Sequence, residues 1–557
     1  MSMNPLLRKI VLIEIILPIV LLVFGIYHGL LQTLYRAGII KASSFLGIGY
    51  YQGLTAHGVI NAIVLTTFFA VAFGHALIVQ HLRKQPHNTF ALTGFVLMLL
   101  GTLMAAAMIF TGNADVLYTF YPPLKAHPIF YLGLALFVVG SWCALFSWIK
   151  PYFEWRRENA HKKVPLAIVG IFVTFIIWQI ATIPVAVEVL FMLFPWSMGW
   201  VSGINVTLAK TLFWFFGHPL VYFWLLPAYI MYYTMLPKLA GSKMYSDFAG
   251  RFSLLVFLVL SSPIGIHHQF TDPGISVNWK ALHGVVTLFI AIPSLMTAFS
   301  VAASLEYGAK KAGGRGLFQW WSKLPYFRAE SWLFPYLFCG LFIFIFGGFT
   351  GIVNASLAMN LVIHNTAWLP AHFHLTVGGP VFLAILGGSL YMLSGLMNKD
   401  IRNTKLAMMV PYLWTLGVCV FSTGLFIGGI LGEPRRTNSG LSYLNPESSM
   451  YKPDWVMSSH IGVLGACIMT LAALIYFYVF FKTLFGKTVV RIQPFAFPDS
   501  EAYHDEDISF VRNLKPWVYA AIVAVIVAYS GPLYDLGTKA WKTDGSKRFS
   551  PTSPLAE

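Results

Sequence analysis

The sequence predicts an all-helical integral membrane protein with about thirteen membrane-spanning helices. Hydrophobic residues make up 57% of its 557 residues and charged residues only 10%, whereas soluble domains are about 25% charged. Apolar stretches long enough to cross a bilayer recur from one end of the chain to the other, and basic residues gather in the short segments between them. These observations exclude an ordinary soluble fold.

Each predicted helix rests on an apolar stretch of about 20 residues, the length that crosses the hydrocarbon core. The stretch after Arg8 and Lys9 has no small-residue cleavage site near its end, so we expect a retained first span and not a removed signal peptide. The thirteen predicted spans lie near residues 10–31, 53–80, 90–112, 127–149, 165–195, 204–236, 252–271, 281–305, 331–352, 366–396, 406–431, 456–482 and 515–532. We predict one transmembrane domain over residues 1–557.

The basic residues predict the orientation. A net charge of +16 in a soluble protein would suggest nucleic-acid binding, but here the clusters follow even-numbered spans, which places those loops and the N-terminus inside and the C-terminus outside. The polar segment 483–513 is then an inside loop, and the predicted partner is the bilayer, with no nucleic acid. The clusters are Arg83 and Lys84; Lys150, Arg156, Arg157, Lys162 and Lys163; Lys238 and Lys243; Lys310, Lys311 and Arg315; Lys399 and Arg402; and Lys482, Lys487 and Arg491. The outside tail departs from the pattern, with Lys539, Lys542, Lys547 and Arg548.

Six of the sixteen histidines fall at related depths, in the outer half of four predicted spans. A single histidine inside a span is more often a packing or pore residue than a ligand, although ionisable groups at membrane depth suggest function. Six at one depth indicate a metal centre. They are His57 in the second span, His218 in the sixth, His267 and His268 in the seventh, and His372 and His374 in the tenth.

Spacing divides these histidines into sets. His372 and His374 are two residues apart, so they point about 200° away from each other on a helix, and each could ligate a separate haem. His57 could supply the opposite axial ligand for one of them. The remaining three imidazoles suit copper. Tyr222 lies four residues after His218 on the same helix face, where a phenol could give a proton and an electron to bound oxygen; a single tyrosine in a span is more often a packing aromatic.

The motifs GHPLVY, HHQF and HNTAW-LPAHFHL, with His57 in TAHG, resemble subunit I of the haem–copper oxidases, and thirteen spans are similar to its B family, the ba-type cytochrome oxidases. The resemblance covers nearly the whole chain and implies a ligand-bearing core over residues 50–440. It implies that His57 and His374 hold a low-spin haem of b type, that His372 holds a high-spin haem of a or o type, and that His218, His267 and His268 bind one copper ion. It also implies that Tyr222 is cross-linked to His218.

Two further motifs lie beside these ligands. Arg435 and Arg436 follow the eleventh span on the outside; arginine suits paired carboxylates, and the resemblance implies contact with haem propionates, the alternative being a solvated surface pair. Asn360 and His364 precede the haem histidines. B-family members often have an acid near the position of Asn360, so its neutral side chain argues against a proton-loading role there. The role of Glu188 in the fifth span stays open.

Polar residues at helical spacing predict a proton path from the inside. Tyr229 and Tyr233 lie four residues apart in the sixth span, and three hydroxyl residues lie three apart in the eighth. The resemblance implies the single K-type path of the B family, whereas Leu220 stands where A-family members usually have Glu. Small hydroxyl residues also pack helices closely in membranes, which is the alternative for each alone. The path residues are Tyr229, Tyr233, Ser246, Ser294, Thr297 and Ser300.

The sequence therefore predicts a terminal oxidase subunit of a prokaryotic plasma membrane that reduces O2 to water, takes protons from the inside and pumps protons. The resemblance implies a partner subunit II with a two-copper electron-entry centre, because the four cysteines of this chain lie singly inside apolar spans and form no cluster for such a centre. The resemblance favours cytochrome c over quinol as donor and adds a small helical subunit. Tyr222 and Leu220 argue against a nitric oxide reductase, and six histidines at one depth argue against a secondary transporter.

Overall fold

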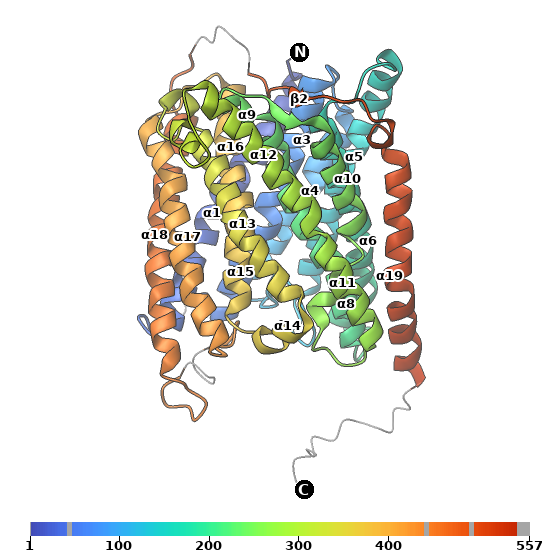
Figure 1. The fold of residues 1–557 in the computed structure, drawn as a ribbon. Helices are drawn as coiled ribbons and strands as arrows, with labels where there is room; N and C mark the ends of the chain where they lie inside the picture. The colour runs from blue at the N-terminus through green and yellow to red at the C-terminus, as the bar shows by residue number, and fades with distance from the viewer. Residues whose placement is uncertain (1, 42–46, 439–444, 490–494, 543–557) are drawn as a thin grey trace.

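The computed structural model describes residues 2–41, 47–438, 445–489 and 495–542. Within them the chain is a bundle of long helices that run side by side along one axis (Figure 1). Helices dominate because a spanning segment must satisfy its own backbone hydrogen bonds in lipid. Among the described residues, twelve helical segments are long and apolar enough to cross a membrane.

The elements in chain order have these bounds: α1 (Pro5–Arg36), α2 (Tyr50–Gly58), η1 (Val59–Val64), α3 (Leu65–His81), α4 (Asn88–Phe110), α5 (Pro128–Glu158), α6 (Leu166–Glu188), η2 (Val189–Leu193), α7 (Phe194–Ser197), α8 (Val206–Thr234), α9 (Leu236–Leu239), β1 (Met244–Ser246), α10 (Asp247–Leu260), η3 (Gly265–Gln269), α11 (Val277–Phe289), α12 (Ala291–Lys311), η4 (Trp320–Lys323), η5 (Ala329–Ser331), α13 (Phe334–Ala355), α14 (Leu357–Ile363), α15 (Trp368–Thr376), η6 (Val377–Val381), α16 (Phe382–Met397), α17 (Thr404–Ile430), α18 (Asp454–Leu484), β2 (Ala502–His504), η8 (Ser509–Val511) and α19 (Leu514–Lys542).

The seventh predicted span, 252–271, differs from the others. It folds as α10, of 14 residues, followed by the short helix η3, so it falls below the length of about 20 residues that a regular spanning helix needs. It is the one of the thirteen predicted spans that is not among those twelve segments. In Figure 1, α1 begins and α19 ends at opposite ends of the bundle.

Residues 502–512, here called the strap, cross the end of the bundle at which α1 begins (Figure 1); this end is called the inner face. β2 of the strap pairs in parallel with β1, in the register Met244↔Ala502 and Ser246↔His504. The strap belongs to the predicted inside loop 483–513, of which residues 490–494 lie outside the described residues, as do Lys547 and Arg548 of the tail.

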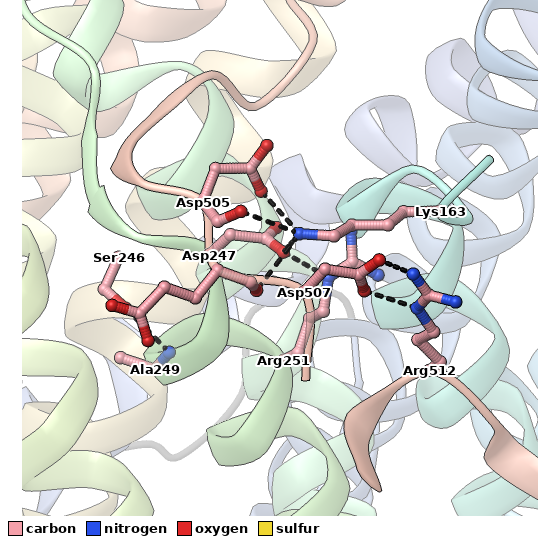
Figure 2. Close-up of polar contacts among 9 residues, drawn as sticks. Lys163, Ser246, Asp247, Ala249, Arg251, Asp505, Asp507 and Arg512 are labelled. Atoms are coloured by element: carbon pink, nitrogen blue, oxygen red, sulfur yellow. Dashed lines mark hydrogen bonds and ion pairs between the residues drawn. The ribbon is translucent and has the colours of Figure 1, made fainter. Parts of the chain in front are cut away.

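Lys163 helps to fasten the strap to the bundle. Lys163 Nζ donates to Asp505 Oδ1 at 2.8 Å and to the main-chain oxygens of Asp505 and Glu506, both at 3.1 Å. It also lies 3.7 Å from Asp247 Oδ2, which accepts from Arg251 Nε at 2.6 Å (Figure 2). Segments far apart in the sequence therefore meet at the first turn of α10.

Candidate metal centre

Three histidines from two elements form a site for a metal ion. His218 lies in α8, and His267 and His268 lie in η3; one ligand nitrogen from each lies within 4.8 Å of the others. His218 Nδ1 lies 3.0 Å from His268 Nε2. Thr287 Oγ1 lies 2.9 Å from His267 Nδ1, which leaves His267 Nε2 free to ligate. Three converging imidazole nitrogens, set in the buried interior, fit a copper ion.

The break after α10 explains why two adjacent histidines can both face this site. Pro263 ends the helix, because the residue before a proline avoids helical geometry. The Gly265 N–H donates to Tyr529 Oη at 2.9 Å, and a Cβ at Gly265 would lie 2.2 Å from the Trp214 carbonyl oxygen, so only glycine allows this approach. The Trp214 ring then stacks on His268, with centroids 3.8 Å apart. The pair is thus held from two sides.

Tyr222 lies beside the copper-type set. Its ring centroid is 5.1 Å from that of His218, one helical turn earlier in α8. His218 Nε2 is buried, and it has no hydrogen-bond partner among the described residues.

The histidines of α15 separate as their spacing predicts. His372 Nδ1 lies 2.8 Å from Thr350 Oγ1 of α13. His374 points elsewhere: its ring is nearly parallel to that of His57, at 17°, with centroids 6.3 Å apart.

Each ring of this facing pair is oriented by a main-chain carbonyl. His57 Nδ1 donates to the Gly25 carbonyl at 2.8 Å, and His374 Nδ1 donates to the Pro370 carbonyl at 2.7 Å. Each ring therefore keeps Nε2 as the atom that can ligate. A π-helical turn follows shortly after each histidine, η1 after His57 and η6 after His374, and such turns are frequent at functional sites.

These two histidines line a cavity of about 310 Å³. Its walls are mainly apolar, with side chains such as Leu65, Phe382 and Val381, and its rim carries Arg36, Glu433, Arg435 and Arg436. An apolar cavity with facing imidazoles and a cationic rim fits a haem, whose macrocycle is apolar and whose propionates are anionic.

The predicted arginine pair lies at this rim, not on an open surface. Arg435 donates to Asn365 Oδ1 from Nε at 3.3 Å and from Nη2 at 3.1 Å, and Arg436 donates to Thr119 Oγ1 at 3.3 Å. Arg436 has a backbone φ of 61°, a left-handed conformation that is rare outside glycine and marks functional sites. Burial, and next the charge of Arg436, lowers the pKa of Arg435 to about 9, which an anion at the rim would reverse.

Asn360 and His364 form a neutral pair beside the arginines. His364 Nδ1 lies 3.1 Å from Asn360 Oδ1, and Asn360 Nδ2 donates to the Asn354 carbonyl at 2.8 Å. Burial, and next the charge of Arg435, lowers the pKa of His364 to about 4, so the pair stays uncharged near neutral pH. Glu188 is buried at the end of α6, and neither of its carboxylate oxygens has a partner among the described residues.

The predicted proton-path residues are brought together only in part. Tyr229 Oη donates to Ser294 Oγ at 3.4 Å, and Tyr233 Oη lies 2.5 Å from Thr297 Oγ1. Ser300 Oγ is buried and has no partner in the described chain. Ser246 instead caps α10, because its Oγ accepts from the Ala249 N–H at 3.2 Å (Figure 2).

A family model described as "Cytochrome C and Quinol oxidase polypeptide I" matches residues 9–459. The chain belongs to this family, subunit I of the haem–copper oxidases. It is 40% identical over 494 residues to cytochrome c oxidase subunit 1 of Thermus thermophilus, covering 87% of this chain and 86% of that protein. It is 26% identical over 475 residues to a heme-copper oxidase subunit I+III of Aeropyrum pernix, covering 80% of this chain and 53% of that protein.

A solved structure described as a heme-copper terminal oxidase dimer is 49% identical, with a TM-score of 0.94, and the match covers 96% of this chain and 94% of that chain. The oxidase subunit is therefore the catalytic subunit of a terminal respiratory oxidase, and it is a multi-pass protein of the bacterial plasma membrane. Membership implies that it carries haem and copper and works with a subunit II.

Sequence reasoning missed the groups that hold the oxidase's histidines in place. Thr287, Thr350 and the carbonyls of Gly25 and Pro370 orient the ligands, and His283 accepts from the Ile266 N–H at 3.3 Å beside the copper-type pair. Thr287 and His283 share one face of α11 at a spacing of four residues, which is the single signal that the sequence offers. The main-chain carbonyls leave no signal in side-chain patterns.

Proposed function

We propose that the oxidase subunit carries two haems and one copper ion and uses them to reduce O2 to water. His57 and His374 would hold a low-spin haem of b type, His372 a high-spin haem of a or o type, and His218, His267 and His268 the copper ion. When bound, the high-spin haem and copper would supply the site at which oxygen is bound and reduced. The observation that carries this proposal is the cluster of three imidazole nitrogens within 4.8 Å of one another.

The chain's own residues would supply position and protons. Thr287 and Thr350 fix the ring orientation of His267 and His372 through hydrogen bonds of 2.9 and 2.8 Å. Tyr222, next to His218, would deliver a proton to reduced oxygen, and we propose that it is cross-linked to that histidine. The pairs Tyr229–Ser294 and Tyr233–Thr297 would pass protons toward Tyr222 from the inner face, and the oxidase would also pump protons.

Electrons would reach the low-spin haem from the outer face, where the rim of its cavity lies. We propose a subunit II with a two-copper centre as the entry point, cytochrome c as the donor and a small helical subunit as a third partner, in an oxidase of the B family. The family description covers both cytochrome c and quinol oxidases, and the 40% identity to a cytochrome c oxidase subunit 1 favours cytochrome c.

Metal analysis of the purified complex, together with a spectrum of the reduced enzyme under carbon monoxide, tests this proposal. We expect two haems and one copper in this subunit, after subunit II copper is counted separately, and carbon monoxide on one haem only. Extra iron with no copper would indicate the nitric oxide reductase chemistry instead. A complex without haem would overturn the assignment of all six histidines.

A further inference from the structure

A buried ion pair lies at the rim of the cavity that His57 and His374 line. Arg36 Nη2 donates to Glu433 Oε1 at 2.8 Å, and the side chain of Glu433 is only 4% exposed. Ser458 Oγ donates to the other oxygen, Oε2, at 3.1 Å. Glu433 thus has both carboxylate oxygens satisfied, as a buried charge requires.

Glu433 also joins the segments that build the rim. Its N–H donates to the Gly428 carbonyl at 2.8 Å, and its own carbonyl accepts from Ala367 N–H at 2.7 Å, immediately before α15. Arg36 Nη2 donates further to the Pro434 carbonyl at 2.9 Å. A Cβ at Gly428 would lie 2.1 Å from Glu433 Oε2, so the glycine is needed for this contact. The end of α1, the α17–α18 connection and the start of α15 therefore meet at one residue, Glu433.

The charged side chains at the rim of the cavity leave an excess of positive charge. Arg36, Arg435, Arg436 and Glu433 line the cavity together. Of the three arginines that line the cavity, Arg36 has an acidic partner, whereas Arg435 and Arg436 form no ion pair among the described residues. Three cations and one anion leave two positive charges, which equals the charge needed to neutralise two haem propionates. Without Glu433 the rim would carry a third uncompensated cation.

We propose that the Glu433–Arg36 pair sets the reduction potential of the low-spin haem and positions Arg435 and Arg436 at its propionates. The inference rests on the proposed assignment of this cavity to the low-spin haem. An added electron is favoured by nearby positive charge and disfavoured by negative charge, and such effects are strong in a buried site of low dielectric. Arg36 therefore raises the midpoint potential of the haem, and Glu433 lowers it.

Redox titration of the low-spin haem band in the purified complex tests this sign rule. Glu433→Gln, which keeps the shape of the side chain, leaves Arg36 uncompensated and raises the midpoint potential. Arg36→Gln leaves the carboxylate uncompensated and lowers it. The double variant returns the potential close to that of the wild type. Asp454→Asn is the matched control, because Asp454 is an exposed acid at the start of α18, directly after the α17–α18 connection, and does not line the cavity.

The outcomes separate this inference from the proposed function. A wild-type complex without a six-coordinate low-spin haem overturns both. A normal low-spin haem whose potential moves no further in Glu433→Gln than in Asp454→Asn overturns the inference alone. If the pair were purely structural, both single variants would lose thermal stability and the midpoint potentials of their low-spin haems would not differ. That outcome would also overturn the inference. Glu433→Gln carries the test by itself if Arg36→Gln does not assemble.

Discussion

At the scale of single residues, the position of Tyr222 beside His218 suits the phenol to proton donation. Tyr222 is a buried phenol whose ring centroid lies 5.1 Å from that of His218, and His218 Nε2 is buried with no hydrogen-bond partner among the described residues. General acid–base groups contribute about 10²–10⁴ to a rate. We expect Tyr222→Phe to keep both haem spectra and the copper content but to slow oxygen uptake about 100-fold or more. Near-normal oxygen uptake would remove Tyr222 from the chemistry.

His372 and His374 are two residues apart, and the structure gives them different surroundings, one beside Thr350 and the other facing His57. We expect His372→Ala to remove the haem that binds carbon monoxide and to leave the low-spin spectrum in place. Optical spectra of the reduced variant, with and without carbon monoxide, measure both. Loss of the low-spin signal alone would reverse the assignment of the two ligands.

The limit of prediction is also visible at this scale. The six histidines and Tyr222 could be selected from the sequence, because ionisable groups inside apolar spans are costly and few. Their supports could not, since Thr350 and the Gly25 carbonyl come from helices 22 and 32 residues away in the sequence. Packing decides which helices are neighbours. Apolar periodicity indicates only that a span is buried, so it does not identify the helices beside it.

At the scale of elements, α8 and α12 form the inner half of the proposed proton path. The bond between Tyr233 and Thr297 joins them at 2.5 Å. Thr297→Val keeps the shape and removes this bond, whose net worth is about 1 kcal/mol, so we expect proton uptake during turnover to slow about fivefold to tenfold. Flow–flash measurements of proton uptake in the purified oxidase follow this step directly.

Thr174→Val is the matched control, because Thr174 is a buried threonine of α6 whose hydroxyl bonds only within its own helix, to the Gly170 carbonyl at 2.7 Å. Equal rates in the two variants would exclude Thr297 from the path. Ser246 shows why spacing alone was insufficient here: its hydroxyl was predicted for the path, but a serine directly before a helix is also an N-cap, and the structure uses it as one.

At the scale of the whole molecule, twelve of the thirteen predicted spans correspond to long apolar helices, and they could be predicted because each span must satisfy its own backbone in lipid. The interruption of the seventh span could not be placed by hydropathy, since Ser261 and Ser262 are buried within an otherwise apolar segment. The position of the strap could not be predicted from the sequence either. Its polar composition indicated a solvated loop, and composition does not reveal that Lys163, more than 300 residues earlier, holds it.

Because Lys163 holds the strap, we predict that replacing it changes how often the strap opens at the inner face. Its three hydrogen bonds to Asp505 and Glu506 fasten the strap next to Asp247 and Arg251 (Figure 2). Lys163 is about one fifth exposed and Asp505 well exposed, so solvent weakens the ion pair, and we expect Lys163→Met to cost about 1–2 kcal/mol, which is about a 5–30-fold rise in the open population of the strap.

Limited proteolysis of inside-out vesicles measures that opening, because the protease reaches only the inner face. We expect faster cleavage within residues 495–512 in Lys163→Met than in the wild type. Lys150→Met is the control, since Lys150 is 72% exposed and its partner Glu154 lies 3.9 Å away on the same helix. Equal cleavage rates in the two variants would show that β2 and its pairing with β1 hold the strap without Lys163, and the pair Asp247–Arg251 would then serve α10 alone.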